Sequence, residues 1–365
     1  MKLLIQPDDG AAALIKGING AKRNVEIAIF RFDQREIEGA LAHAVSRGVS
    51  VHALIAHTNR AGEQNLRKLE LRLLAAGVTV ARTADDLLRY HGKFMIVDGR
   101  ELYLLGFNLT YLDIEYSRSF GIVTRGRRLV SEATRLFEAD SKRNPYEPGL
   151  DNLVVSPANA RRRLASFIQG ARRQLLIYDP EISDPAIMRR LEDRVRAGVD
   201  VRIIGKITRK SSHLPSRKLQ RWRLHTRTII RDGQSAFIGS QSLRAVELDM
   251  RREVGVIFRD ARVVNQLLKV FHDDWMAVGQ EREAPAPDPA PVEKLARKVA
   301  KAVAKELPAV APVVDTVVKE FDLEVNTAQV EENVKDAVKA AVKEAVQDAV
   351  EEAVQEAVQN GGGHK

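Results

Sequence analysis

Two short segments of the chain combine a histidine, a cation and an aspartate at one spacing. They are His91-Gly-Lys93-Phe-Met-Ile-Val-Asp98-Gly99 and His225-Thr-Arg227-Thr-Ile-Ile-Arg-Asp232-Gly233. In each, the cation follows the histidine by two residues, and the aspartate follows it by seven, at an Asp-Gly turn. An imidazole titrates near neutral pH and can attack phosphorus or transfer a proton, while a cation beside it neutralises phosphate oxygens. The segments therefore indicate chemistry on a phosphodiester, with Lys93 and Arg227 as the phosphate-binding residues.

The spacing of these residues is that of a β-strand ending in a turn. Residues two apart lie on one face of a strand, so each histidine and its cation project side by side, and the aspartate closes the strand. Two such pairs facing one another would supply a nucleophile and a general acid from one residue type. We expect one composite active site, with catalytic roles for His91, Lys93, Asp98, His225, Arg227 and Asp232.

An internal repeat carries the two segments. The first copy has apolar strand patterns at 25–30 and 51–56 around a helical pattern at 35–47. The second copy has strand patterns at 175–178 and 199–204 around a helical pattern at 185–196, and only the first copy has a further helical stretch, at 63–76. Alternating strands and helices predict α/β layers with largely buried strands.

The segments and their order resemble the phospholipase D superfamily, whose signature is His-x-Lys-x4-Asp, then a Gly-Ser-x-Asn-like turn and a downstream acidic residue. The resemblance covers about residues 3–275. It implies a pseudo-two-fold repeat of two α/β halves, with mixed sheets flanked by helices and both motifs meeting across the axis. It also implies a phosphohistidine on one histidine and proton transfer by the other. Water or an alcohol then releases the phosphoryl group, without a cofactor or a metal ion.

The first half departs from the family signature at two positions. Asn108 matches the asparagine of the turn, but Gly106 stands where serine is expected and Ser119 occupies the acidic position. Asp113 or Glu115 could supply the missing carboxylate to the first-half histidine. The resemblance thus makes Asn108 a supporting residue of the site.

The second half departs at other positions. Ser240 and Glu253 match the serine of the turn and the acidic residue, whereas Arg227 replaces lysine and Ser242 replaces asparagine. A carboxylate behind an imidazole fixes its tautomer, so Glu253 is expected to support His225. Arginine keeps the charge of lysine with a different reach, so activity is plausible. The resemblance does not assign which histidine is the nucleophile.

The charge of the chain changes near residue 280. Residues 1–280 carry 47 basic and 32 acidic side chains, a net +15, whereas 281–365 carry 11 and 17, a net −6. A basic body attracts polyanions, which include nucleic acid, anionic lipid and phosphorylated small molecules. The basic segment 206–227 leads into the second motif and is expected to lie beside the site.

The composition predicts four parts: a first half at 1–145, a second half at 146–280, a Pro/Ala-rich linker at 281–292 and a low-complexity helical tail at 293–365. The tail is expected to be a solvated helix, with self-association and contact with an anionic membrane as the alternatives. The chain has no cysteine, which excludes thiol catalysis and a disulfide framework. The apolar run at the N-terminus is too short for a signal peptide, so we expect a cytoplasmic protein, with peripheral contact at the inner face of the membrane as an extension.

Three functional classes fit these observations. The first is phosphodiester hydrolysis or phosphatidyl transfer on phospholipids, as in phospholipase D and cardiolipin synthase, and this interpretation is favoured. The second is a nuclease acting on DNA or RNA, for which the basic body argues. The third is a catalytically silent phosphate-binding scaffold, suggested by the altered positions Gly106, Ser119, Arg227 and Ser242.

Overall fold

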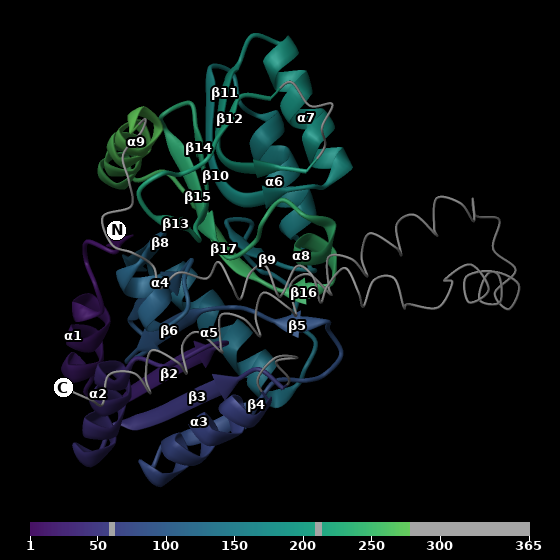
Figure 1. The fold of residues 1–365 in the computed structure, drawn as a ribbon. Coiled ribbons are helices and arrows are strands. Elements are labelled where there is room, and N and C mark those ends of the chain that lie inside the picture. The colour runs from purple at the N-terminus through teal and green to yellow at the C-terminus, as the bar shows by residue number, and fades with distance from the viewer. Residues whose placement is uncertain (58–62, 209–213, 278–365) are drawn as a thin grey trace, which may run out of the picture. The chain divides into compact units, whose positions relative to one another are not determined.

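The computed structural model describes residues 1–57, 63–208 and 214–277 (Figure 1). Nearly all of them belong to one compact unit that contains both copies of the repeat. The expected linker at 281–292 and tail at 293–365 lie outside the described residues. Among the described residues, no helix combines the length and the apolar character needed to cross a membrane.

In its described residues, the first copy contains a mixed β-sheet and five helices. Its strands are β1 (Lys2–Gln6), β2 (Asn24–Ile29), β3 (Ser50–Ile55), β4 (Thr79–Arg82), β5 (Arg89–Tyr90), β6 (Phe94–Val97), β7 (Glu101–Leu105) and β8 (Ser117–Thr124). Its helices are α1 (Ala12–Gly20), α2 (Arg35–Ser46), α3 (Glu63–Ala75), α4 (Tyr111–Glu115) and α5 (Arg127–Lys142). The helix expected at 63–76 is therefore confirmed as α3.

The second copy repeats these elements with a shorter connection in place of α3. Its strands are β9 (Leu153–Val155), β10 (Gln174–Ile182), β11 (Asp200–Ile207), β12 (Ser216–Arg217), β13 (Arg223–Leu224), β14 (Arg227–Arg231), β15 (Ser235–Gly239), β16 (Arg251–Arg252) and β17 (Val254–Phe258). Its helices are α6 (Ala160–Gln169), α7 (Pro185–Arg196), α8 (Ala245–Asp249) and α9 (Ala261–Met276). The strands and helices expected in both copies are thus present.

The two large sheets have the same strand order. The first runs β1-β8-β7-β6-β2-β3-β4 and the second β9-β17-β15-β14-β10-β11-β12. In the first sheet, β2 pairs parallel with β3 and antiparallel with β6, the strand of the first histidine motif. In the second sheet, β10 pairs parallel with β11 and antiparallel with β14, the strand of the second histidine motif. The expected pseudo-two-fold α/β repeat with mixed sheets is confirmed.

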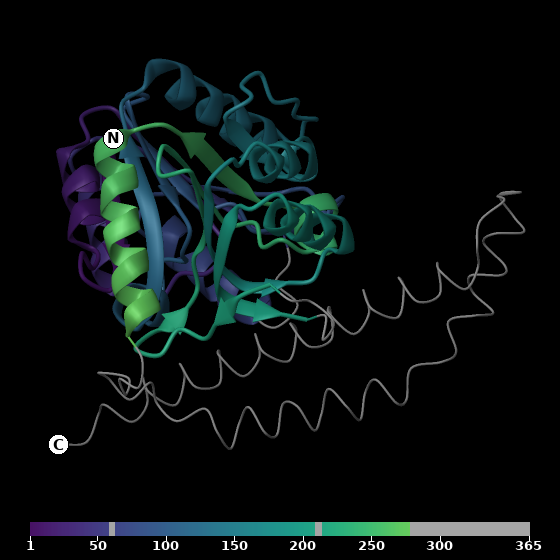
Figure 2. The same cartoon turned by 90° about the horizontal axis from the view of Figure 1, so that it is seen from above.

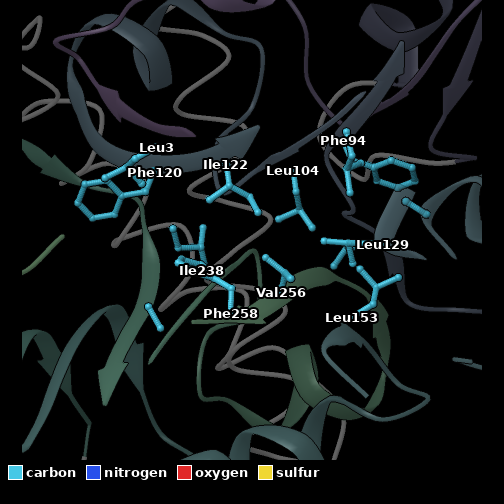
Figure 3. Packing of buried hydrophobic residues seen from close by; sticks show 14 of the residues in the cluster. Leu3, Phe94, Leu104, Phe120, Ile122, Leu129, Leu153, Ile238, Val256 and Phe258 are labelled. Atoms are coloured by element: carbon cyan, nitrogen blue, oxygen red, sulfur yellow. The ribbon is translucent and has the colours of Figure 1, made fainter. Parts of the chain in front are cut away.

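Among the described residues, the three largest apolar clusters hold the layers together. One packs α1, α2 and α3 against the first sheet, and a second packs α6 and α7 against the second sheet. The largest joins both sheets with α5 and α9; Leu104 and Ile122 of the first sheet and Ile238 and Val256 of the second belong to it (Figure 3). Figure 2 shows α9, in light green, lying lengthwise beside the strands, and it contacts β1, β14 and β15. Because one core is shared, the halves are fixed against each other, as a composite site requires.

Two short parallel ribbons connect the halves next to the histidine motifs. Strand β5, just before His91, pairs with β16 of the second half. Strand β13, just before His225, pairs with the start of β8 in the first half. Each histidine is therefore placed beside the opposite half of the repeat.

Candidate active site

The backbone of each histidine is hydrogen-bonded across the repeat. The N–H of His91 donates to the carbonyl of Arg252 at 2.7 Å, and the N–H of His225 donates to the carbonyl of Arg118 at 3.2 Å. Arg118 and Arg252 occupy equivalent positions, one residue before Ser119 and Glu253. Each histidine is thus next to the acidic position of the other half, not of its own.

His91 is bonded to Glu253. Its Nδ1 lies 2.8 Å and 3.0 Å from the two carboxylate oxygens, and Glu253 is fully buried. The expectation that Glu253 supports His225 is therefore wrong, because the pairing of β5 with β16 carries Glu253 to the first-half histidine. A carboxylate at Nδ1 fixes the ring tautomer and leaves Nε2 with its lone pair.

The surroundings of His91 disfavour its charged form. Burial lowers the pKa of the His91 imidazole, and the positive charges of Lys93, Arg227 and Arg251 lower it further. Burial also raises the pKa of Glu253, and the negative charge of Glu247 adds to the effect. The contact is accordingly a hydrogen bond of a neutral imidazole, the state in which Nε2 can act as a nucleophile.

Phe30 closes the site on the side of His91. Its ring meets the imidazole edge to face, with the ring centroids 4.5 Å apart, and the Lys93 ammonium lies 5.6 Å from the same ring centroid. Phe30 ends the apolar pattern at 25–30, and no role at the site was expected for it. The signal that could have marked it is its place at the end of β2, the strand that pairs with the motif strand β6.

The two cations occupy equivalent positions. Lys93 donates from Nζ to the carbonyl of His91 at 2.8 Å, and Arg227 donates from Nη1 to the carbonyl of His225 at 2.9 Å. Arg227 also donates from Nε to the hydroxyl of Ser242 at 3.1 Å. The longer arginine is thus paired with the shorter serine, where the first half has lysine and asparagine. Both cations remain beside a histidine, as the strand spacing predicts.

His225 has an acidic neighbour from the first half. Its Nε2 lies 3.1 Å from Oδ2 of Asp113, which belongs to α4. Arg223, at the end of the basic segment 206–227, donates to Oδ1 of Asp113 at 2.7 Å. Asp113 was expected to compensate for Ser119 at His91. That interpretation is wrong, because the pairing of β13 with β8 brings His225 to Asp113 instead. The C-terminal end of the basic segment does lie at the site.

The serine of the turn and the carboxylate occur together in one half only. The hydroxyl of Ser240 accepts the N–H of Val254 at 3.1 Å and donates to its carbonyl at 3.4 Å, and it lies close enough to Glu253 to oppose the rise in the pKa of that carboxyl. In the first half the equivalent residues are Gly106 and Ser119. A Cβ atom at Gly106 would lie 2.7 Å from the Phe120 carbonyl oxygen, so a serine would clash with backbone there. The site is therefore asymmetric, with a complete carboxylate and serine pair behind His91.

The aspartates of the two motifs lie at the far ends of their strands. Asp98 accepts the N–H groups of Lys22, Arg23 and Asn24 at 2.7 to 3.1 Å, and has a positive φ of 55°. Asp232 makes the equivalent bonds to 172–174 and has a φ of 54°. The structure does not bring Asp98 or Asp232 to the imidazoles. Both tie the turn after the motif strand to the start of the neighbouring strand.

Replacing Asp98 by alanine is expected to lower stability by about 1 to 2 kcal/mol, because three backbone donors lose their acceptor. Burial alone raises the pKa of Asp98, but the three N–H groups bring the pKa below its ordinary value. Its contribution is therefore present above the unfolded pKa of an aspartate and is lost as the pH falls through the folded pKa. Thermal unfolding at pH 7 and pH 3 measures the difference; a catalytic loss without a stability loss would contradict this assignment.

Phosphate binding is expected to weaken as the pH rises through about 7. Burial lowers the pKa of Lys93 to about 7, and the negative charge of Glu253 opposes this shift. Lys93 is charged below that pH and neutral above it, so its attraction for a phosphate oxygen decreases with rising pH. Titration of the protein from pH 5.5 to 9 with sulfate, a phosphate analogue whose charge is constant over this range, measures the effect. Lys93→Arg should remove the decrease, because arginine stays protonated; an unchanged pH dependence in this variant would assign it to another group.

No cluster of three or more His, Asp or Glu side chains is placed to hold a metal ion in the part of the chain that the structure describes.

Asn108 and Ser240, the expected supporting residues, both lie at the site. Asn108 donates from its side chain to Asp113 at 2.8 Å, and Ser240 lies behind Glu253.

Comparison with known proteins adds a family and a fold. The family model described as "Cardiolipin synthase, PLD-like domain" matches residues 14–141 and 164–275. A mitochondrial cardiolipin hydrolase of Danio rerio is 28% identical over 135 residues, which are 36% of this chain and 58% of that protein. The chain thus spans somewhat over half the length of the curated relative that it matches.

The fold also occurs in solved structures, of which two are compared with this chain. The polyphosphate kinase of Porphyromonas gingivalis has a TM-score of 0.63 at 17% identity, over 74% of this chain and 46% of that chain. The phosphatidylserine synthase of Haemophilus influenzae Rd KW20 has a TM-score of 0.57 at 11% identity, over 84% of this chain and 95% of that chain. At these identities the likeness concerns the arrangement of the chain alone.

Proposed function

Since the chain belongs to the phospholipase D-like family described as "Cardiolipin synthase, PLD-like domain", we propose that it cleaves or transfers phosphodiesters of phospholipids through a phosphohistidine. The observation that carries the proposal is the contact of His91 Nδ1 with the buried Glu253 across the repeat. It leaves Nε2 as the nucleophilic nitrogen of a neutral imidazole. His225, with its own acidic neighbour, is the proton donor.

In the first step, Nε2 of His91 attacks phosphorus, and the bond from phosphorus to the leaving alcohol oxygen breaks. His225 donates a proton to that oxygen, so a neutral alcohol leaves and a phosphohistidine forms on His91. The Nδ1 hydrogen of His91 remains directed at Glu253, which stabilises the positive charge on the ring.

In the second step, His225 accepts a proton from water or from an alcohol, whose oxygen attacks phosphorus. The bond between phosphorus and Nε2 breaks, and His91 returns to its neutral form. Water gives hydrolysis and an alcohol gives an exchanged lipid. The same residues therefore serve both a phospholipase D-like and a cardiolipin synthase-like reaction.

The two cations bind the non-bridging oxygens of the phosphate. Lys93 is a buried point charge, and the planar fork of Arg227 can contact two oxygens at once. Arg227 lies close enough to both His91 and Lys93 to influence their pKa values. This supports a single phosphate site that takes its charges from both halves. It also argues against a silent scaffold, because the Arg227 guanidinium keeps the position that lysine has in the first half.

A phospholipid is the substrate class supported by the family description and by the name of the curated relative. Such a substrate would place the protein in peripheral contact with an anionic membrane, for which the net +15 of residues 1–280 is suitable. We extend this to a cytoplasmic location at the inner membrane face.

A nuclease is the second candidate, and one observation favours it. A groove of about 630 Å³ between α6 and α7 is lined by four arginines, with Ser166, Gln169 and one acidic residue. The arginines are Arg162, Arg189, Arg190 and Arg196. A row of guanidinium groups in a concave groove suits a chain of phosphates such as a nucleic acid backbone.

The test is a parallel incubation, with EDTA, of wild type and His91→Ala/His225→Ala with phosphatidylglycerol vesicles and with single-stranded DNA. Released head group or exchanged lipid, lost in the variant, supports the lipid proposal. Cleaved DNA, lost in the variant, would replace it by the nuclease. Turnover that persists in the variant, or none with either substrate, would contradict the proposed mechanism.

A further inference from the structure

On the side of His225, the position equivalent to Glu253 has no carboxylate. By the symmetry of the repeat, Ser119 stands to His225 as Glu253 stands to His91. The Ser119 hydroxyl is buried and has no hydrogen-bond partner among the described residues. The serine that assists Glu253 is also absent, since Gly106 replaces it and a side chain would clash there. The carboxylate and the serine that lie behind His91 thus both lack a counterpart behind His225.

Asp113 approaches His225 from a different element. It is the third residue of α4, its side chain is 2% exposed, and its carboxylate has three kinds of partner. Oδ2 accepts both the backbone N–H and the side-chain amide of Asn108 at 2.8 Å, and lies 3.1 Å from His225 Nε2. Oδ1 accepts Nη1 of Arg223 at 2.7 Å. These bonds fix the carboxylate, so its negative charge stays beside the imidazole.

The equivalent carboxylate of the second half serves a different purpose. Glu247 accepts the N–H of Ser242, as Asp113 accepts that of Asn108. Its carboxylate is paired with Arg244 and Arg251. Capping the turn is thus the task that both carboxylates share, and contact with a histidine is the feature specific to Asp113.

We propose that Asp113 is the positioning residue of His225 and replaces, from α4, the carboxylate that Ser119 does not provide. A carboxylate beside an imidazole favours the imidazolium. Nε2 of this imidazolium faces the Asp113 carboxylate at 3.1 Å, which keeps the negative charge beside the ring. Proton donation rests on the proposed function, whereas the pairing of Asp113 with His225 does not.

The other charged groups around His225 act in the opposite direction. Arg223 of β13 binds Asp113 and reduces the negative charge that the imidazole experiences. Arg227 of β14 donates to the carbonyl of His225. Lys93 lies close enough to Asp113 for the negative charge of Asp113 to raise the pKa of Lys93. Asp113 is therefore an anionic group that faces the ring within a cluster of cations.

The experiment follows the titration of the His225 ring by NMR in the full-length protein labelled with ¹⁵N-histidine, the signal being assigned by its loss in His225→Gln. Asp113→Asn is expected to move the titration midpoint of His225 down by about one pH unit. Arg223→Gln is expected to move it up, because it removes a cation from the pair. Glu247→Gln, which removes the equivalent capping charge in the other half, should leave it in place.

An unchanged midpoint in both Asp113→Asn and Arg223→Gln would overturn the proposal, and so would an equal shift in Glu247→Gln. If Asp113→Asn does not fold, the upward shift in Arg223→Gln decides. The titration needs no substrate, so it judges the pairing even if no phospholipid or DNA is turned over. With an active substrate, Asp113→Asn should slow poor leaving groups more than good ones, which a purely structural loss would not do.

Discussion

Replacement of His91 by alanine is expected to lower turnover by at least about 10⁴-fold and to abolish the covalent intermediate. The physical reason is that Nε2 of His91 is the atom that bonds to phosphorus, and the variant has no group that can take its place. The intermediate is measured by rapid alkaline quench with a substrate labelled in the phosphoryl moiety, because a phosphohistidine survives base and is lost in acid.

His225→Ala is expected to behave differently. Loss of the proton donor slows departure of an alkoxide, but a substrate with a p-nitrophenolate leaving group needs no proton. This variant should therefore still form labelled protein from the activated substrate and then release it slowly. His52→Ala on β3 removes an exposed histidine and serves as the matched control. Labelled protein in His91→Ala and none in His225→Ala would reverse the two roles.

Replacement of Glu253 by glutamine is expected to reduce kcat by about 10² to 10⁴-fold with little change in KM. Glutamine has the same shape, but unlike Glu253 it cannot ionise to stabilise the imidazolium that forms on His91. Its amide can also donate to Nδ1 and so favour the wrong tautomer. Steady-state kinetics at a fixed pH measure this loss, and the smaller effect of Ser240→Ala is the companion measurement, since Ser240 only orients Glu253.

The same substitution should leave the stability unchanged or raise it at alkaline pH. Burial raises the pKa of Glu253 above its ordinary value. A group with a raised folded pKa contributes stability that is lost as the pH rises through that value. At pH 9 the wild type has to ionise this buried carboxylate, whereas Glu253→Gln does not. Thermal unfolding at pH 6 and pH 9 tests this; a lower melting temperature in the variant at pH 9 would contradict the argument.

The change of activity and stability in opposite directions would show that Glu253 is retained for chemistry. Ionisation of a buried carboxylate lowers the stability of the fold at alkaline pH, and a residue with a purely structural role would not have this effect. The reverse is expected for Asp98, where stability falls and the rate of the folded enzyme is unchanged. The two acids of one family signature thus separate into a chemical and a structural one.

The sequence determined the local part of this protein. Apolar runs located β2, β3, β10 and β11, and the helical patterns located α2, α3 and α7. The two-residue period of a strand placed Lys93 beside His91 and Arg227 beside His225, because this relation depends only on the pleat. The Asp-Gly pairs marked turns because both residues must adopt a positive φ there. The repeat and its family followed from these local features in sequence order.

Tertiary structure decided which acid serves which histidine. His91 and Glu253 are 162 residues apart, and they meet because β5 pairs with β16. His225 and Asp113 meet because β13 pairs with β8. These ribbons are two residues long, too short for any periodic pattern in the sequence to mark them. The sequence shows which residue types are present in each half. The pairings of β5 with β16 and of β13 with β8 place an acid of one half beside the histidine of the other, and the asymmetry of the site follows from this arrangement.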